Sequence, residues 1–344
     1  MKRAKNITRP AAYKSAEQRG LFLALATVIP LVVVFSMQVW QRSAYSGTVF
    51  HLQGFINVYG TSVYKYRVLG SRLLLEIYYF LTRHYTDHPF LMPGDSHATF
   101  LFYAAYCVIN SIFFSLFNLL LLIFIWDKGK VLSDLRLAQY FFIVLVVALS
   151  SCAVTPYDQL AYFLMLVAFL SVKLKSSWRM YFVLGAAAIA GSLNRETEFL
   201  ITPALLTLGL FAGPAGSKRF YHAGLYHLFL FAIFYVGLRV FLSGKPEVTA
   251  AFIYGGKWGL ASLIVAVALF YIGFKLAIRE YVNHRPTIVL LILSAPYIIT
   301  ILLSGEIREL RLLVPLLLCL FFVYIELARL KTENEDAPDG QEYV

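Results

Sequence analysis

The sequence predicts an all-α polytopic membrane protein with about ten transmembrane helices. Hydrophobic residues make up 60% of its 344 residues, charged residues only 14%, and the mean hydropathy is +0.70. Soluble domains carry about 25% charged residues, so this balance excludes that class. Because a helix needs about 20 apolar residues to cross a bilayer, the long apolar runs are the candidate spans. They cover 21–40, 101–126, 138–154, 159–172, 180–193, 199–213, 224–242, 258–278, 287–303 and 312–328.

Two of these runs, 159–172 and 180–193, are short for a span. Either they pack tilted against neighbouring helices, or their ends open into a water-filled cavity, where backbone that does not span is tolerated. The first run, 21–40, ends in Val-Trp-Gln-Arg without a small-residue cleavage site. It therefore favours a retained membrane anchor over a removable signal peptide.

The distribution of Lys and Arg predicts the orientation in the membrane. An N-terminus in the cytoplasm places most basic residues of the short loops inside, as the positive-inside rule requires. These inner loops explain the net charge of +11, so the charge does not indicate a nucleic-acid partner. We expect a multi-pass protein of the cytoplasmic membrane with both termini inside. Its parts are a basic N-terminus (1–20), a transmembrane domain (21–330) and an acidic cytoplasmic tail (331–344).

The first outer loop, residues 41–100, is predicted to contain an interfacial helix over 62–83. A stripe of charged residues at helical spacing marks its polar side: Lys65, Arg72, Glu76 and Arg83. Arg67 lies about 200° from Lys65 on such a helix, which places it among apolar side chains. An Arg there needs an anionic partner, either a lipid phosphate or a phosphate held in an active site.

Charged residues interrupt the apolar sequence in four places, all predicted to lie on the outer side. Ionised groups at bilayer depth cost roughly 2.5–3.5 kcal/mol each, so such residues commonly mark a site. Their convergence would form a site for a charged ligand. The clusters are Lys65 with Arg67, Tyr157 with Asp158, Asn194 with Arg195 and Glu196, and Glu306 with Arg308, Glu309 and Arg311.

Each cluster also has a structural interpretation. Thr155 could cap a helix that has Pro156 at its first position and Asp158 in its first turn. The Asn194–Glu196 turn could form an Arg–carboxylate clasp between two helices, and Arg311 could extend to the membrane interface. In the functional alternative, Arg308 and Arg311 lie on adjacent parts of one helix face. Two planar donors placed so would suit a phosphate or diphosphate.

Cofactor and metal signals are weak. The chain has no Gly-rich phosphate loop, nucleophile elbow or dinucleotide fingerprint, so we expect no cofactor. A divalent metal is the lesser alternative, because His84 and His88 have i, i+4 spacing in a loop that also holds Asp87, Asp95 and His97.

The layout of residues 20–328 resembles the GT-C superfamily of membrane glycosyltransferases, which use polyprenyl-phosphate sugars. An anchor helix, a long outer loop with surface helices and many short-looped spans carry the resemblance. The stretches YKYRVLGSRLL, TPYDQLAYF, SLNRETEFL and GEIRELRLLVPLL look similar to those of small bacterial membrane proteins with this layout. The superfamily's base is usually an acidic residue early in the first outer loop. This chain has none between Trp40 and Glu76.

The resemblance implies a sugar transfer from a polyprenyl-phosphate donor to a glycan, lipid or protein acceptor at the outer face. The base would be Asp158 by preference, or Glu196 or Glu76. The lipid phosphate would bind Arg308 and Arg311, with Arg67 and Arg195. Orienting roles would fall to Tyr157, Asn194, Glu306 and Glu309. One alternative is a transporter or lipid translocator for an anionic cargo. Another is a non-catalytic membrane subunit, or a different class of lipid-linked enzyme such as a polymerase or acyltransferase.

Overall fold

The described part of the protein is all-α. The computed structural model describes residues 20–22, 24–28, 30–33, 36, 49–61, 63–91, 95–126, 133–150, 155–242, 258–279, 281–304 and 310–335. Within these ranges the extended pairing is a single bridge between Pro89 and Thr99.

Fifteen helical elements lie within the described residues. They are the π-helix η1 (Ala24–Val28), α3 (Leu52–Thr61), the 3₁₀ helix η2 (Val63–Tyr66), α4 (Val68–His84), α5 (Phe100–Ile125), α6 (Asp134–Ser150), α7 (Asp158–Ser171), α8 (Ser177–Asn194), the 3₁₀ helix η3 (Glu196–Leu200), α9 (Ile201–Phe211), α10 (Gly213–Phe241), α11 (Trp258–Ala277), α12 (Arg285–Leu293), α13 (Ala295–Ser304) and α14 (Leu310–Glu335).

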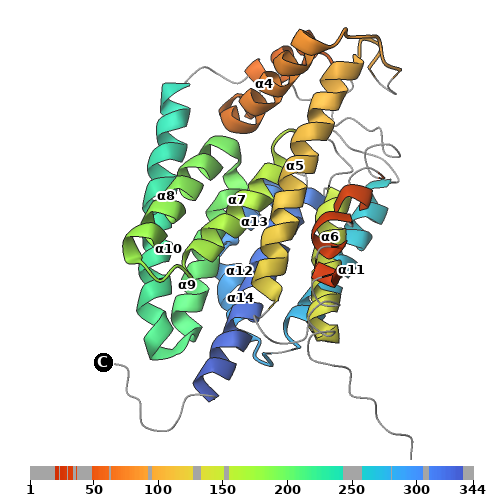
Figure 1. The fold of residues 1–344 in the computed structure, drawn as a ribbon. Coiled ribbons are helices and arrows are strands. Elements are labelled where there is room, and N and C mark those ends of the chain that lie inside the picture. Colours follow the sequence, from red (N-terminus) through yellow and green to blue (C-terminus); the bar gives the residue numbers. More distant parts are fainter. Residues whose placement is uncertain are drawn as a thin grey trace, which may run out of the picture.

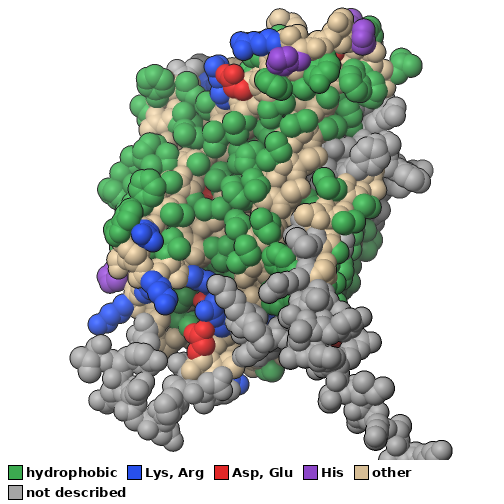
Figure 2. All heavy atoms as spheres, viewed as in Figure 1, with side chains coloured by type: hydrophobic (Ala, Val, Ile, Leu, Met, Phe, Trp, Pro, Cys, Tyr) green, Lys and Arg blue, Asp and Glu red, His purple; other side chains and the backbone are tan. Residues whose placement is uncertain are grey.

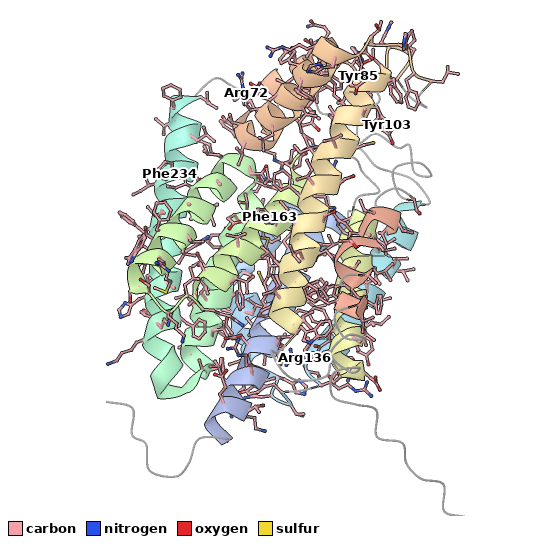
Figure 3. All side chains as sticks on the ribbon, in the orientation of Figure 1. Arg72, Tyr85, Tyr103, Arg136, Phe163 and Phe234 are labelled. Carbon is pink, nitrogen blue, oxygen red and sulfur yellow. The ribbon has the colours of Figure 1, made fainter. Side chains whose placement is uncertain are left out.

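The longer helices form a bundle, and α4 lies across one of its ends (Figure 1). The helix predicted over 62–83 is confirmed as η2 followed by α4, with a break at Arg67. Arg72, on α4, lies at this end of the bundle, whereas Arg136, in a predicted inner loop, lies near the opposite end (Figure 3). These two residues, one from a predicted outer loop and one from a predicted inner loop, therefore lie at opposite ends of the bundle.

Three described helical segments are long and apolar enough to cross a membrane. They support the prediction of a membrane protein, without its number of spans. They are Phe100–Ile125, Gly216–Phe241 and Leu312–Glu333. The prediction of ten spans is therefore wrong. Helix α7 has 14 residues and α9 has 11, well below the length that a span needs. The apolar run 287–303 is divided at Ser294 into α12 and α13, of 9 and 10 residues. The predicted first span lies only partly within the described residues.

Of the three long helices, α14 is the most deeply buried. Its most apolar 18-residue window is 89% buried, whereas the corresponding window of α10 is only 17% buried. Residues such as Phe229, Val240 and Phe241 leave the outer side of α10 apolar and exposed. Hydrophobic side chains cover the middle of the face seen in Figure 2, and most charged side chains gather towards its two ends. This banding is what a lipid-facing surface requires.

Two buried polar side chains of the bundle bind one backbone oxygen atom. The amide of Asn118 and the hydroxyl of Tyr140 donate hydrogen bonds to the backbone oxygen of Leu25, at 2.8 and 3.0 Å. Leu25 lies in the π-helix η1, where the usual α-helical bonding pattern is interrupted. These side chains therefore replace water, which is absent from a bilayer interior.

Candidate functional site

A buried ion pair joins the start of α7 to the end of α8. The guanidinium of Arg195 donates to the Asp158 carboxylate, and the two residues are only 1% and 2% exposed. Asp158 lies in the first turn of α7, as predicted, where the helix dipole favours a carboxylate. The predicted cap is wrong by two residues, since Tyr157 and not Thr155 precedes the helix.

A second ion pair links the break before α4 to η3. The Nη2 atom of Arg67 donates to Oε1 of Glu196 at 2.5 Å, although the two residues are 129 apart in the sequence. The side chains are 12% and 34% exposed. The predicted helix is broken at Arg67, and the anionic partner of Arg67 is a protein carboxylate.

Tyr157 connects the two ion pairs. The guanidinium carbons of Arg67 and Arg195 lie 4.4 and 5.8 Å from the centroid of its ring. The side-chain amide of Asn194 donates to the Tyr157 backbone oxygen at 2.9 Å. These contacts hold the two pairs in one group of six residues, which we call the charged cluster: Arg67, Tyr157, Asp158, Asn194, Arg195 and Glu196.

A glycine allows α4 to approach the charged cluster. A Cβ atom at Gly70 would lie 2.8 Å from the Pro156 backbone oxygen and 2.9 Å from the Asn194 side-chain oxygen. Both distances are shorter than real Cβ contacts, so a larger residue would push α4 away. The available signal in the sequence was a glycine at position 70, inside the predicted helix and three residues after Arg67, because a glycine there allows close backbone approach.

Two neighbouring guanidinium groups determine the protonation state of Glu196. Burial alone would raise its pKa, but the guanidiniums of Arg67 and Arg195 outweigh burial and lower the pKa from 4.5 to about 2. Glu196 is therefore ionised at neutral pH and serves as a hydrogen-bond acceptor.

The low pKa of Glu196 predicts a loss of stability in acid. A carboxyl group whose pKa is lower in the folded state stabilises the fold above its unfolded pKa, and the stabilisation is lost as pH falls through the folded value. We expect the unfolding temperature of the wild type in detergent to exceed that of Glu196→Gln at pH 6, and the gap to close between about pH 4.5 and pH 2. A gap that stays constant down to pH 2 would contradict the Arg67–Glu196 pair.

The other sequence-predicted site residues lie elsewhere or beyond the described residues. Glu76 is exposed on α4 and pairs with Arg72 at 2.6 Å, so it is not part of the charged cluster. Glu306, Arg308 and Glu309 lie outside the described residues, as does the side chain of Arg311.

The described beginning of α14 lies near the charged cluster. The hydroxyl of Tyr297, on α13, donates to the backbone oxygen of Leu312 at 2.7 Å. The same tyrosine interacts electrostatically with Arg195, Glu196 and Asp158. Tyr297 therefore links the described beginning of α14, at Leu312, to the cluster.

Sequence reasoning missed the contribution of α10. The guanidinium carbon of Arg239 lies 3.5 Å from the ring centroid of Tyr235 and 4.8 Å from that of Tyr66. Tyr235 also interacts electrostatically with Glu196 and Arg67. The available signal was the i, i+4 spacing of Tyr235 and Arg239 at the end of an apolar run, which favours a cation–π contact.

The two carboxylates considered for a metal accept backbone hydrogen bonds. An oxygen of Asp87 accepts the backbone N–H of Leu101 at 2.9 Å, in the first turn of α5. Asp95 accepts the backbone N–H of Phe50 at 3.0 Å and contacts His51. Within the described ranges, no group of three or more His, Cys, Asp or Glu side chains is placed to hold a metal ion.

The fold and the site define an all-helical membrane protein with a charged cluster at one end of its bundle. Comparison with protein-family models, with curated proteins and with solved structures found no match to this chain.

Proposed function

We propose that the protein is an integral membrane glycosyltransferase that moves a sugar from a polyprenyl-phosphate donor to an acceptor at the outer face of the cytoplasmic membrane. The observation that carries this proposal is the convergence of two Arg–carboxylate pairs around Tyr157. Such a group supplies both chemical functions that the transfer needs. They are cations for a phosphate leaving group and a carboxylate for a proton.

Glu196 is the better placed base. Its side chain is one-third exposed, whereas Asp158 is almost completely buried against Arg195. A carboxylate must come within hydrogen-bond distance of the acceptor hydroxyl to accept its proton. We therefore assign the base to Glu196 and give Asp158 the task of positioning Arg195.

The Arg67–Glu196 pair suggests how donor binding prepares the reaction. The donor phosphate competes with Glu196 for the Arg67 guanidinium, because phosphate and carboxylate bind the same planar donors. The displaced carboxylate then accepts the proton of the acceptor hydroxyl while the acceptor oxygen bonds to the anomeric carbon. The bond from that carbon to the phosphate oxygen breaks, and the phosphate leaves with the electron pair. Arg67 and Arg195 stabilise the growing negative charge.

The proposed topology places both termini in the cytoplasm and the charged cluster outside. Both termini on one side require an even number of crossings, so shorter helices cross the membrane as well as the three long ones. A helix as short as α7 can cross where its end meets a buried polar group such as the Asp158–Arg195 pair. The acceptor is a glycan, a lipid or a protein.

Turnover of a labelled donor tests the proposal. The purified protein in liposomes is given a polyprenyl-phosphate sugar with envelope extract as acceptor, and release of polyprenyl phosphate is measured. We expect Glu196→Gln to lower turnover by about 10²–10⁴-fold, as for loss of a general base. Arg67→Ala should lower it by about 10²–10³-fold, as for loss of an electrostatic donor.

The exposed Arg72–Glu76 pair provides matched controls on the neighbouring helix. Arg72→Ala and Glu76→Gln should retain the wild-type rate. Equal turnover in wild type and Glu196→Gln, at equal folded yield, would remove the proposed role of Glu196. Movement of an anionic cargo across sealed vesicles, with no bond broken, would instead establish a transporter.

A further inference from the structure

A second group of ionisable side chains lies deeper in the bundle. Oε1 of Glu198, on η3, lies 3.7 Å from Nε2 of His227, on α10, and both side chains are fully buried. On the other side of the imidazole ring, Nδ1 of His227 lies 3.0 Å from the hydroxyl oxygen of Thr202, on α9. Three elements therefore bring an acid, an imidazole and a hydroxyl into one row.

Polar atoms of this row lack hydrogen-bond partners among the described residues. They are both carboxyl oxygens of Glu198 and Nε2 of His227. Buried polar atoms are normally paired, because leaving them unpaired is costly. The unsatisfied atoms face each other across 3.7 Å, slightly beyond a hydrogen bond. A small movement of one side chain would join them.

The surroundings offer no counter-charge to this row within the described part of the chain. From α14, the thiol of Cys319 interacts electrostatically with Glu198. From α8, Gly191 faces the Glu198 side chain. The neighbouring charges along the chain are neutralised elsewhere, Arg195 by Asp158 on α7 and Glu196 by Arg67.

We propose that Glu198 and His227 form a buried proton-binding site, in which the Glu198 carboxyl holds a proton and offers it to Nε2 of a neutral His227. In this arrangement His227 donates its Nδ1–H to the Thr202 oxygen, so the lone pair of Nε2 faces Glu198. The row then carries no net charge. Loss of the proton would leave an isolated carboxylate in an apolar interior, which is strongly unfavourable.

The chemistry of the site is that of proton binding. Acid and imidazole side chains inside membrane bundles are a common means of binding and passing protons. The site does not depend on sugar transfer, since none of its three residues belongs to the charged cluster.

Infrared spectroscopy of the full-length protein in lipid nanodiscs tests the proposal. The wild type should show, at neutral pH, the carbonyl stretch of a protonated carboxylic acid, shifted in D₂O. Glu198→Gln should abolish this band, and the exposed control Glu76→Gln should retain it. His227→Phe should move it to the higher frequency of an acid without a hydrogen-bond acceptor.

Two results would overturn the proposal. The first is a wild-type spectrum without the acid band at neutral pH, because Glu198 would then be ionised. The second is a band whose frequency His227→Phe leaves unchanged, because the acid would then not face the imidazole. This second comparison identifies the band even if Glu198→Gln does not fold.

Discussion

Replacing Arg195 with methionine is expected to lower the free energy of unfolding by about 3–5 kcal/mol, the usual effect of removing one partner of a buried ion pair. Arg195 and Asp158 are 1% and 2% exposed, so the remaining carboxylate would be buried without its cation. Chemical unfolding of the purified protein in detergent micelles measures the change. The exposed Arg72→Met is the matched control and should change stability by less than about 1 kcal/mol.

A second substitution should restore most of the lost stability. Buried ion pairs can often be replaced by apolar residues of similar volume at little net cost, because desolvation offsets their attraction. We therefore expect Asp158→Leu combined with Arg195→Met to be more stable than Arg195→Met alone. A double variant that is less stable than the single one would indicate that Asp158 has another partner which outweighs Arg195.

Replacing Gly191 with alanine is expected to destabilise the protein by about 1–3 kcal/mol through overpacking. A Cβ atom at this position would lie 2.2 Å from Cγ and 2.6 Å from Cδ of Glu198, where two heavy atoms cannot fit. Alanine would otherwise favour the α8 helix by up to about 1 kcal/mol, so the steric effect must exceed this gain. Thermal unfolding in detergent provides the measurement.

Two further variants isolate the steric cause. Gly237, on α10, has open space at its Cβ position, so Gly237→Ala should be neutral or stabilising. Adding Glu198→Ala to Gly191→Ala removes the overlapping Cγ and Cδ atoms and should recover part of the stability. A Gly191→Ala variant as stable as the wild type would show that α8 and η3 are packed differently.

The charged cluster was partly predictable because its residues interrupt an apolar sequence. All six residues of the cluster were singled out on that ground, and the contacts place them together. Which Arg meets which carboxylate was not predictable. That pairing depends on the break before α4 and on the extended backbone of Arg195, and neither has a spacing rule in the sequence.

The number of spans was overpredicted for a related reason. Hydropathy reports burial in protein and burial in lipid alike, and α9 is apolar because it packs inside the bundle. Length distinguishes the two cases, and breaks such as Ser294 shorten runs that look continuous. The pair of Glu198 and His227 escaped notice because His227 is an isolated polar residue in an apolar run, with nothing nearby in the sequence to suggest its partner.

The proposed function depends above all on the contact between Arg67 and Glu196, since it unites the first outer loop with the α8–α9 turn. A double-mutant cycle of Arg67→Ala and Glu196→Ala, read from unfolding free energies in detergent, tests this contact most directly. Residues in contact usually give a coupling energy of about 0.5–3 kcal/mol, and we expect a value in this range. A coupling energy of zero would mean that the two side chains do not meet, and the candidate site would not exist in this form.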